Sequence, residues 1–209
     1  MTRGETRSRI AGPAGALEVA LNVPVAAPRG IALVAHPHPL QGGTLDNKVA
    51  QTLAKTFVAL GYASIRFNFR GAGNSEGSFD DGIGETADAL AALAFAQREF
   101  AAVAATPPVL AGFSFGSYVQ TRVAHEVTAE RLVLVGPAVK RFPVEHVPAG
   151  TIVIHGEQDD VVALTDVLDW ARPQHLPIVV FPGCGHFFHG RLTQLQQAIV
   201  GQWKPAELR

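Results

Sequence analysis

The segment Gly112–Gly116, which reads Gly-Phe-Ser-Phe-Gly, has the residue types and spacing of a turn that exposes a nucleophilic hydroxyl. It follows the apolar run Val109–Ala111, and residues with helical apolar spacing come after it. A serine between glycines at a strand-to-helix turn is lifted clear of the sheet, and larger residues in place of the glycines would collide with its strained backbone. Ser114 is therefore the candidate nucleophile; the alternative is a structural turn without a chemical role.

A serine hydroxyl is a weak nucleophile, so it needs a general base, and that base needs an orienting carboxylate. The strand predicted over Thr151–His155 leads into a loop with two adjacent carboxylates, Asp159 and Asp160. Adjacent side chains point in different directions, so only one of the two can face the base. The other would be a carboxylate at a helix N-terminus.

The candidate base comes from the loop after the last predicted strand, Pro177–Phe181. His186 and His189 both lie in this loop. His186 is nearer to the end of the strand and directly follows a glycine, so we expect it to be the base and His189 to lie at the surface. The chain order serine, acid, histidine then puts all three groups after strands.

Short apolar runs alternate with amphipathic segments from residue 30 onward. This pattern predicts an α/β fold in one domain, residues 1–209, with a mostly parallel twisted sheet covered by helices on both faces. Ala16–Val25 should add one or two antiparallel edge strands. The predicted strands are Gly30–Ala35, Tyr62–Phe69, Pro108–Gly112, Arg131–Val135, Thr151–His155 and Pro177–Phe181. The predicted helices lie within Asn47–Leu60, Asp80–Phe100, Leu164–Ala171 and Leu192–Ile199, and one follows Ser114.

Composition narrows the classes of partner. The chain has 209 residues, a net charge of −1 and one cysteine. A net charge close to zero argues against nucleic acid or an anionic membrane as the main partner. A single cysteine excludes an intramolecular disulfide. No signal peptide or membrane span is predicted, so we expect a cytoplasmic protein. The oligomeric state stays open.

The chain resembles small, lid-less serine hydrolases of the α/β-hydrolase superfamily, close to the dienelactone-hydrolase-like group. The segments that carry the resemblance are His36–Pro39, Gly42–Gly43, Phe67–Gly71, Gly112–Gly116, Gly156–Val162 and Gly183–His189. The resemblance implies Ser114 as nucleophile, Asp159 as acid, three residues after its glycine, and His186 as base. Dienelactone hydrolases proper have cysteine at the nucleophile position, so their substrate does not carry over.

Two backbone amides should stabilise the oxyanion. One is that of Phe115; the other should come from the loop after Gly30–Ala35. Prolines 37 and 39 have no N–H. His38 is therefore the first choice for the second amide donor, and Leu40 is the second choice. The loop has Pro37 where the superfamily commonly has glycine.

The substrate site should be open. Only residues 136–150 separate two strands between which many relatives insert a cap, so we expect no cap domain. Leu40, Phe113, Phe115, Phe187 and Phe188 are the candidate substrate contacts, with ordinary core packing as the alternative for each.

Two other motifs have competing interpretations. His36 and His38 share one side of an extended segment and could bind a metal, although Asp46 is the only acidic residue nearby, and a structural His36 is favoured. The glycine-rich loop Arg70–Gly77 lacks the ending of a phosphate-binding P-loop, so Arg70 is expected to anchor it.

The function predicted from these features is hydrolysis of ester or thioester bonds in small acyl substrates, through an acyl-enzyme on Ser114 and without a cofactor or metal. The alternatives are a non-catalytic or partner-binding protein on the same fold, and a metal-dependent hydrolase that uses His36 and His38.

Overall fold

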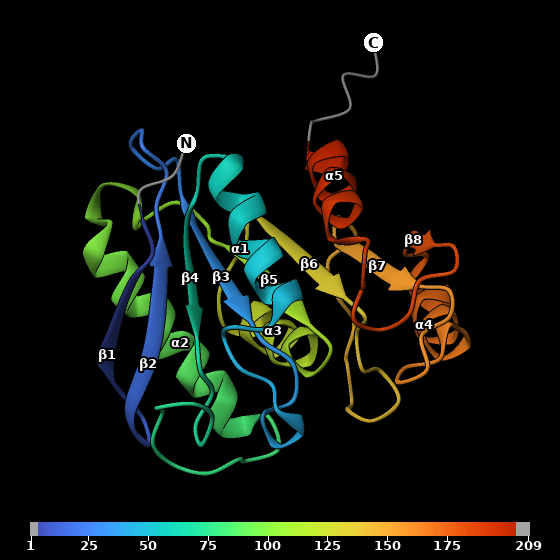
Figure 1. Cartoon of the computed structure of the whole chain (residues 1–209), viewed down its shortest axis with the longest axis horizontal. Coiled ribbons are helices and arrows are strands. Elements are labelled where there is room, and N and C mark those ends of the chain that lie inside the picture. The colour runs from blue at the N-terminus through green and yellow to red at the C-terminus, as the bar shows by residue number, and fades with distance from the viewer. Residues whose placement is uncertain (1–3, 204–209) are drawn as a thin grey trace.

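The core of the structure is an eight-stranded sheet. The structure, a computed structural model, describes residues 4–203. The strands are β1 (Thr6–Gly12), β2 (Gly15–Asn22), β3 (Ile31–Ala35), β4 (Ala63–Phe67), β5 (Val109–Phe113), β6 (Arg131–Val135), β7 (Ile152–Gly156) and β8 (Ile178–Phe181). Across the sheet their order is β1-β2-β4-β3-β5-β6-β7-β8, as Figure 1 shows.

Strands β3 to β8 are parallel, and only the hairpin β1–β2 runs antiparallel to its neighbours. The parallel strands β3, β4, β5 and β7 are buried along their whole length. This burial on both faces explains the continuous apolar sequences of β3 and β5, whereas β4 also buries Ser64 and Arg66. Because these strands share one direction, the loops after β3, β5, β7 and β8 all leave the same edge of the sheet. The predicted mostly parallel sheet is confirmed.

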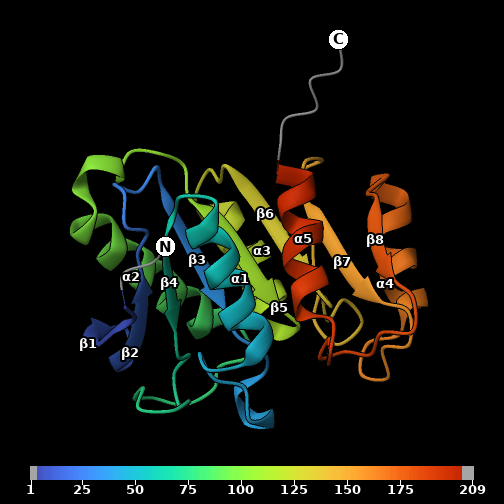
Figure 2. The same cartoon turned by 45° about the horizontal axis from the view of Figure 1, so that its top comes forward.

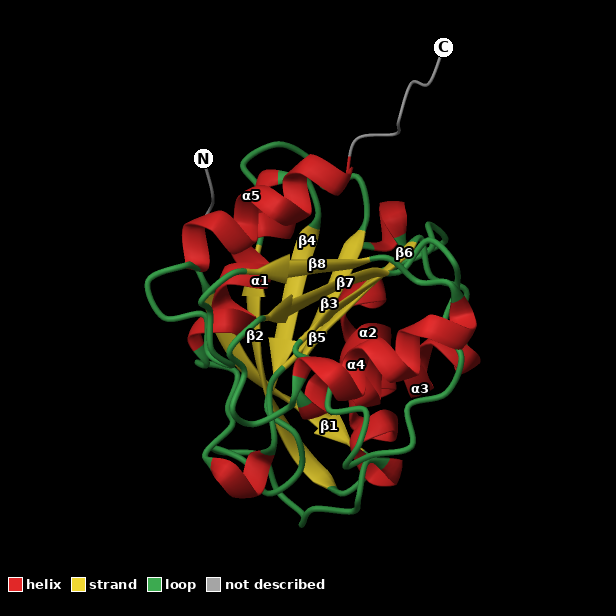
Figure 3. Cartoon of the chain, turned by 90° about the vertical axis from the view of Figure 1, so that its right-hand side faces the viewer, coloured by secondary structure: helices red, strands yellow, loops and turns green. Residues whose placement is uncertain are grey.

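Within residues 4–203 there are five α-helices, of which four connect strands and the last follows β8. They are α1 (Lys48–Ala59), α2 (Ile83–Glu99), α3 (Phe115–Glu126), α4 (Leu164–Ala171) and α5 (Leu192–Trp203). Figure 2 shows α1 and α5 side by side over one face of the sheet. Seen from the side in Figure 3, α2, α3 and α4 cover the opposite face. Helices therefore cover both faces, as predicted.

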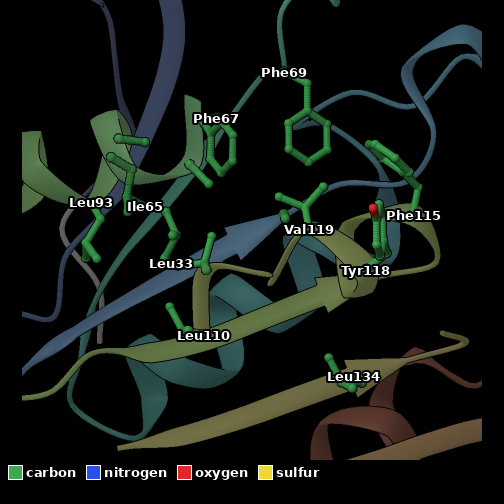
Figure 4. Close-up of a cluster of buried hydrophobic side chains, with 14 of the residues drawn as sticks. Leu33, Ile65, Phe67, Phe69, Leu93, Leu110, Phe115, Tyr118, Val119 and Leu134 are labelled. Atoms are coloured by element: carbon green, nitrogen blue, oxygen red, sulfur yellow. The ribbon is translucent and has the colours of Figure 1, made fainter. Parts of the chain in front are cut away.

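Each face of the sheet carries its own apolar core. On the α2–α3 face, Leu33, Ile65 and Leu110 from adjacent strands pack against Leu93 and Val119 (Figure 4). All five are at most 3 % exposed, and burying a side chain of this size contributes about 1.5–3 kcal/mol. On the other face, a second cluster packs under α1 and α5. A sheet fixed from both sides gives the loops at its edge a rigid base.

The N-terminal hairpin differs in part from the prediction. Strand β2 matches the expected edge strand, but the outer strand β1 begins at Thr6, before the predicted range. Its side chains are mostly exposed, so it has little of the apolar signal used to find strands. The ends of the predicted domain, residues 1–3 and 204–209, lie outside the described residues.

No cap is inserted between β6 and β7. Residues 136–151 contain neither helix nor strand and run as a short irregular loop. Within residues 4–203, no helix combines the length and apolar character needed to cross a membrane.

Candidate active site

Ser114 lies in a strained turn between β5 and α3. Its φ of 55° and ψ of −117° are conformations that a residue with a side chain rarely adopts. The flanking glycines allow the turn: a Cβ on Gly112 would come 2.2 Å from the Gly116 carbonyl oxygen, and one on Gly116 would come 2.5 Å from that of Ala35. The Ser114 amide donates to the Val135 carbonyl at 2.9 Å, which ties the turn to β6. The predicted strand–turn–helix context is confirmed.

Of the two adjacent carboxylates, Asp159 turns inward and Asp160 is exposed. The loop after β7 folds around the Asp159 carboxylate. Its Oδ1 accepts hydrogen bonds from the amides of Val161 at 2.9 Å and Val162 at 2.7 Å. Two backbone donors fix the orientation of this carboxylate and leave Oδ2 for another partner.

That partner is His186, whose Nδ1 lies 2.6 Å from Asp159 Oδ2. In the neutral imidazole, Nδ1–H donates to the carboxylate, and Nε2 is then the nitrogen that can accept a proton. Burial alone would raise the pKa of Asp159, but the hydrogen bonds from His186 and the Val162 amide hold it below its usual value. Asp159 thus stays ionised, as required of a group that orients an imidazole.

The His186 ring is held from two sides. The ring of Phe113 packs against it with a centroid separation of 4.8 Å. Gly136 lies on another side, where an added Cβ would come 3.2 Å from His186 Cε1. Gly136 also has a φ of 53°, so both backbone and space favour glycine there. By contrast, His189 is exposed and stacks on Phe187.

Sequence reasoning missed a second histidine at the carboxylate. His155, at the end of β7, is fully buried, and its Nε2 lies 2.9 Å from the Val162 carbonyl oxygen and 3.4 Å from Asp159 Oδ2. Burial lowers its pKa, so it is a neutral imidazole whose Nε2–H donates to Val162. His155 therefore closes the loop that holds Asp159. Its position directly before Gly156, at the end of a strand that leads to the acid loop, is the one sequence signal for this role.

The predicted oxyanion donors differ in their availability. The Phe115 amide opens α3 and has no partner within the helix. In the loop after β3, the amides of residues 41, 42 and 43 donate to carbonyls of the same loop, and the Leu40 amide donates to His38 Nδ1 at 3.2 Å. The second choice, Leu40, is therefore wrong because its N–H is already used. Among residues 4–203, the His38 amide has no acceptor, which leaves it available.

Two pockets meet at Ser114 and form one groove. The first, here called the Phe142 lobe, has a volume of about 190 Å³ and includes Phe115, Ala138, Arg141 and Phe142. The second, the His186 lobe, has about 120 Å³ and includes Pro37, Asn47, His186 and Phe187. Both lobes are lined by His38, Gln41, Ser114 and Val161. Ser114 is 8 % exposed and lines both lobes, so solvent and ligands reach it through this groove.

Three of the five predicted substrate contacts are wrong. Phe113 and Phe188 are fully buried: Phe113 supports the His186 ring, and Phe188 packs against Phe181 in the core. Leu40 is 71 % exposed and borders neither lobe. Phe115 and Phe187 do line the groove, so the sequence could not assign each aromatic ring to core or surface.

His36 is a structural residue, which contradicts the metal-site alternative. Its Nε2 accepts from the Phe69 amide at 3.0 Å, and its Nδ1–H donates to the Pro37 carbonyl at 2.6 Å. Both ring nitrogens are therefore used by backbone, and none is left for a metal ligand bond. Among the described residues, no group of three or more potential ligands converges.

Burial of His36 predicts acid sensitivity. Burial chiefly, with the neighbouring His38, lowers the pKa of His36 to about 3 from 6.5. Between these values the unfolded chain binds a proton that the folded protein does not, so the free energy of unfolding falls as pH falls. Relative to His36→Gln, which does not titrate, wild type should lose about 2 kcal/mol between pH 7 and pH 5.

Urea unfolding of both proteins at the two pH values measures this difference. All other titrating groups are common to the two proteins and largely cancel in the comparison. Parallel pH dependences would show that His36 is not kept neutral by the fold.

Arg70 anchors the glycine-rich loop, as predicted. Its Nη2 donates to Asp88 Oδ1 at 2.8 Å and its Nε to Oδ2 at 3.0 Å. Asp88 on α2 is fully buried, and the Arg70 guanidinium borders neither lobe of the groove. This arginine is thus committed to the fold.

The chain is similar to several known proteins in sequence and fold. Residues 40–148 match a family model described as serine aminopeptidase, S33. A protein of Rickettsia prowazekii described as uncharacterised is 32 % identical, with 90 % of this chain and 84 % of that protein covered. An α/β serine hydrolase without a lid from Xanthomonas campestris is 35 % identical with a TM-score of 0.89, over 97 % of this chain and 96 % of that one.

A second solved structure, an α/β serine hydrolase homologue from Coxiella burnetii, is 36 % identical with a TM-score of 0.87. The alignment covers 95 % of this chain and 97 % of the Coxiella burnetii chain. Because the family model matches more than half of the chain, the chain belongs to the serine aminopeptidase S33 family of the α/β-hydrolase superfamily. Its strand order and the absence of a cap between β6 and β7 make it a lid-less hydrolase of that fold.

Proposed function

We propose that this protein hydrolyses ester or thioester bonds of small acyl substrates through an acyl-enzyme on Ser114. The observation that carries the proposal is the 2.6 Å hydrogen bond between His186 Nδ1 and Asp159 Oδ2, beside a groove that Ser114 and His186 both line. An acid–base pair in this tautomer next to a strained serine is the arrangement that activates a hydroxyl.

In the first half of the reaction, Ser114 Oγ attacks the acyl carbon and His186 Nε2 takes its proton. Asp159 stabilises the imidazolium that forms. The developing oxyanion accepts hydrogen bonds from the amides of Phe115 and His38, and one such donor is typically worth about 3 kcal/mol. His186 then gives the proton to the leaving oxygen or sulfur, and the acyl group stays on Ser114.

In the second half, water attacks the acyl-enzyme. His186 removes a proton from this water and returns it to Ser114 Oγ as the acid product leaves. The open groove suits this step because water reaches Ser114 without the movement of a lid. Ester and thioester bonds fit best, since their leaving groups need less help than an amine.

Trapping the acyl-enzyme tests the proposal. The protein is labelled with a fluorophosphonate probe, and separately acid-quenched during turnover of 4-nitrophenyl acetate. Peptide mass spectrometry should find the probe and the acetyl group on Ser114. If a panel of esters and thioesters is not turned over and Ser114 is unlabelled, the non-catalytic alternative replaces this proposal.

A further inference from the structure

The two lobes of the groove differ in their access to the general acid. His186 lines only the His186 lobe, whereas the amide-bearing Phe115 lines only the Phe142 lobe. A leaving group must lie beside the imidazole that protonates it. If the proposed function holds, the leaving group therefore occupies the His186 lobe and the acyl chain extends into the Phe142 lobe.

The Phe142 lobe is small and mainly apolar in its walls. Phe115, Ala138, Phe142 and Val162 are all less than 10 % exposed and form its inner surface. Its volume of about 190 Å³ suits a short acyl chain.

Two cations border this lobe, and they differ in their partners. Lys140 Nζ lies 3.3 Å from Asp166 Oδ1, so its charge is compensated by a residue that lines the same lobe. Arg141 has no carboxylate partner at ion-pair distance within residues 4–203. Its guanidinium carbon lies 5.7 Å from the centre of the Phe142 ring, which places the charge over the aromatic wall.

The charge of Arg141 also acts at the centre of the groove. His38 lines both lobes together with Ser114. Burial chiefly lowers the pKa of His38, the positive charge of Arg141 lowers it further, and the negative charge of Asp81 raises it. Arg141 is therefore an exposed cation on the wall of the Phe142 lobe, without a carboxylate at ion-pair distance within residues 4–203.

We propose that the preferred substrates are monoesters of short dicarboxylic acids, whose free carboxylate binds Arg141 while the chain packs against Phe142. A guanidinium accepts a carboxylate through two parallel N–H donors, a strong and directional interaction. The proposal rests on the proposed function and adds the chemical class of the acyl group.

Two esters of equal chain length test it. Wild type should hydrolyse mono-4-nitrophenyl glutarate at least tenfold faster in kcat/KM than 4-nitrophenyl pentanoate, which has a methyl group in place of the carboxylate. In Arg141→Gln this ratio should fall to about one, and Arg141→Lys should retain part of it. Arg98→Gln is the matched control: it removes one positive charge from an exposed position that borders neither lobe, and the ratio should stay at the wild-type value.

A measurement on wild type alone does not depend on the folding of any variant. Free glutarate should inhibit hydrolysis of the neutral ester competitively, whereas pentanoate should not, and added salt should weaken the inhibition. Turnover of both esters at equal rates without inhibition by glutarate would overturn the anionic preference and leave the hydrolase intact. Turnover of neither ester, with Ser114 unlabelled, would overturn the proposed function itself.

Discussion

Replacing Ser114 with alanine is expected to lower kcat for 4-nitrophenyl acetate by a factor of about 10⁵ to 10⁶ and to abolish fluorophosphonate labelling. In the proposed mechanism the variant lacks the nucleophile, while the amides of Phe115 and His38 still polarise a bound carbonyl. The fold should survive. Alanine keeps the Cβ and hence the same backbone strain, and the Ser114 side chain makes no capping hydrogen bond to α3. We expect the free energy of unfolding to change by less than about 0.5 kcal/mol.

The matched control is Ser78→Ala, which removes a hydroxyl from an exposed position. It should label and turn over like wild type. Undiminished labelling of Ser114→Ala would refute the assignment of the nucleophile. A folded variant with a near-normal rate would do the same, because Ser114 is the only hydroxyl residue among residues 4–203 that lines both lobes.

Replacing Asp159 with asparagine is expected to lower kcat by a factor of about 10⁴. The reason lies in the hydrogen bonds of the carboxylate. Oδ1 accepts from the amides of Val161 and Val162, so the asparagine carbonyl oxygen must take that place. The NH₂ group then faces His186 Nδ1. That nitrogen must become an acceptor, the proton moves to Nε2, and the imidazole can no longer take a proton from Ser114.

Asp160→Asn provides the comparison, because it makes the same change in the neighbouring, exposed residue. It should retain wild-type kcat. Steady-state kinetics of the two variants, together with circular dichroism spectra, separate a catalytic loss from unfolding. Equal losses in both variants would mean that the loop, and not the Asp159 carboxylate, controls the rate.

Most of the fold could be predicted because its signals are local. The buried strands β3, β5 and β7 are short continuous apolar runs, and Gly61 ends the α1 segment where a helix stop was expected. Strand β1 was missed because its side chains face solvent. Arg66 shows the opposite problem. It lies buried within β4 and pairs with Glu5, a contact between distant residues that no local pattern reveals.

The site was predicted in its order along the chain but not in its details. The order of Ser114, Asp159 and His186 after β5, β7 and β8 is a sequence property, and parallel strands bring such loops to one edge. Whether a ring such as Phe113 or Phe188 faces the groove or the core depends on the packing of α5 and β8, which the sequence does not state. The same is true of His155, because its partners are set by how the loop after β7 closes.

Val161 combines two roles that use different parts of the same residue. Its amide holds Asp159, whereas its side chain is 54 % exposed and forms part of the wall of both lobes. Every amino acid except proline has the amide, so mutations at this position can reshape the groove and keep the acid in place. Evolution could therefore diversify the substrates of such hydrolases at position 161 at little risk to catalysis, and a saturation library there is a natural starting point for changing their selectivity.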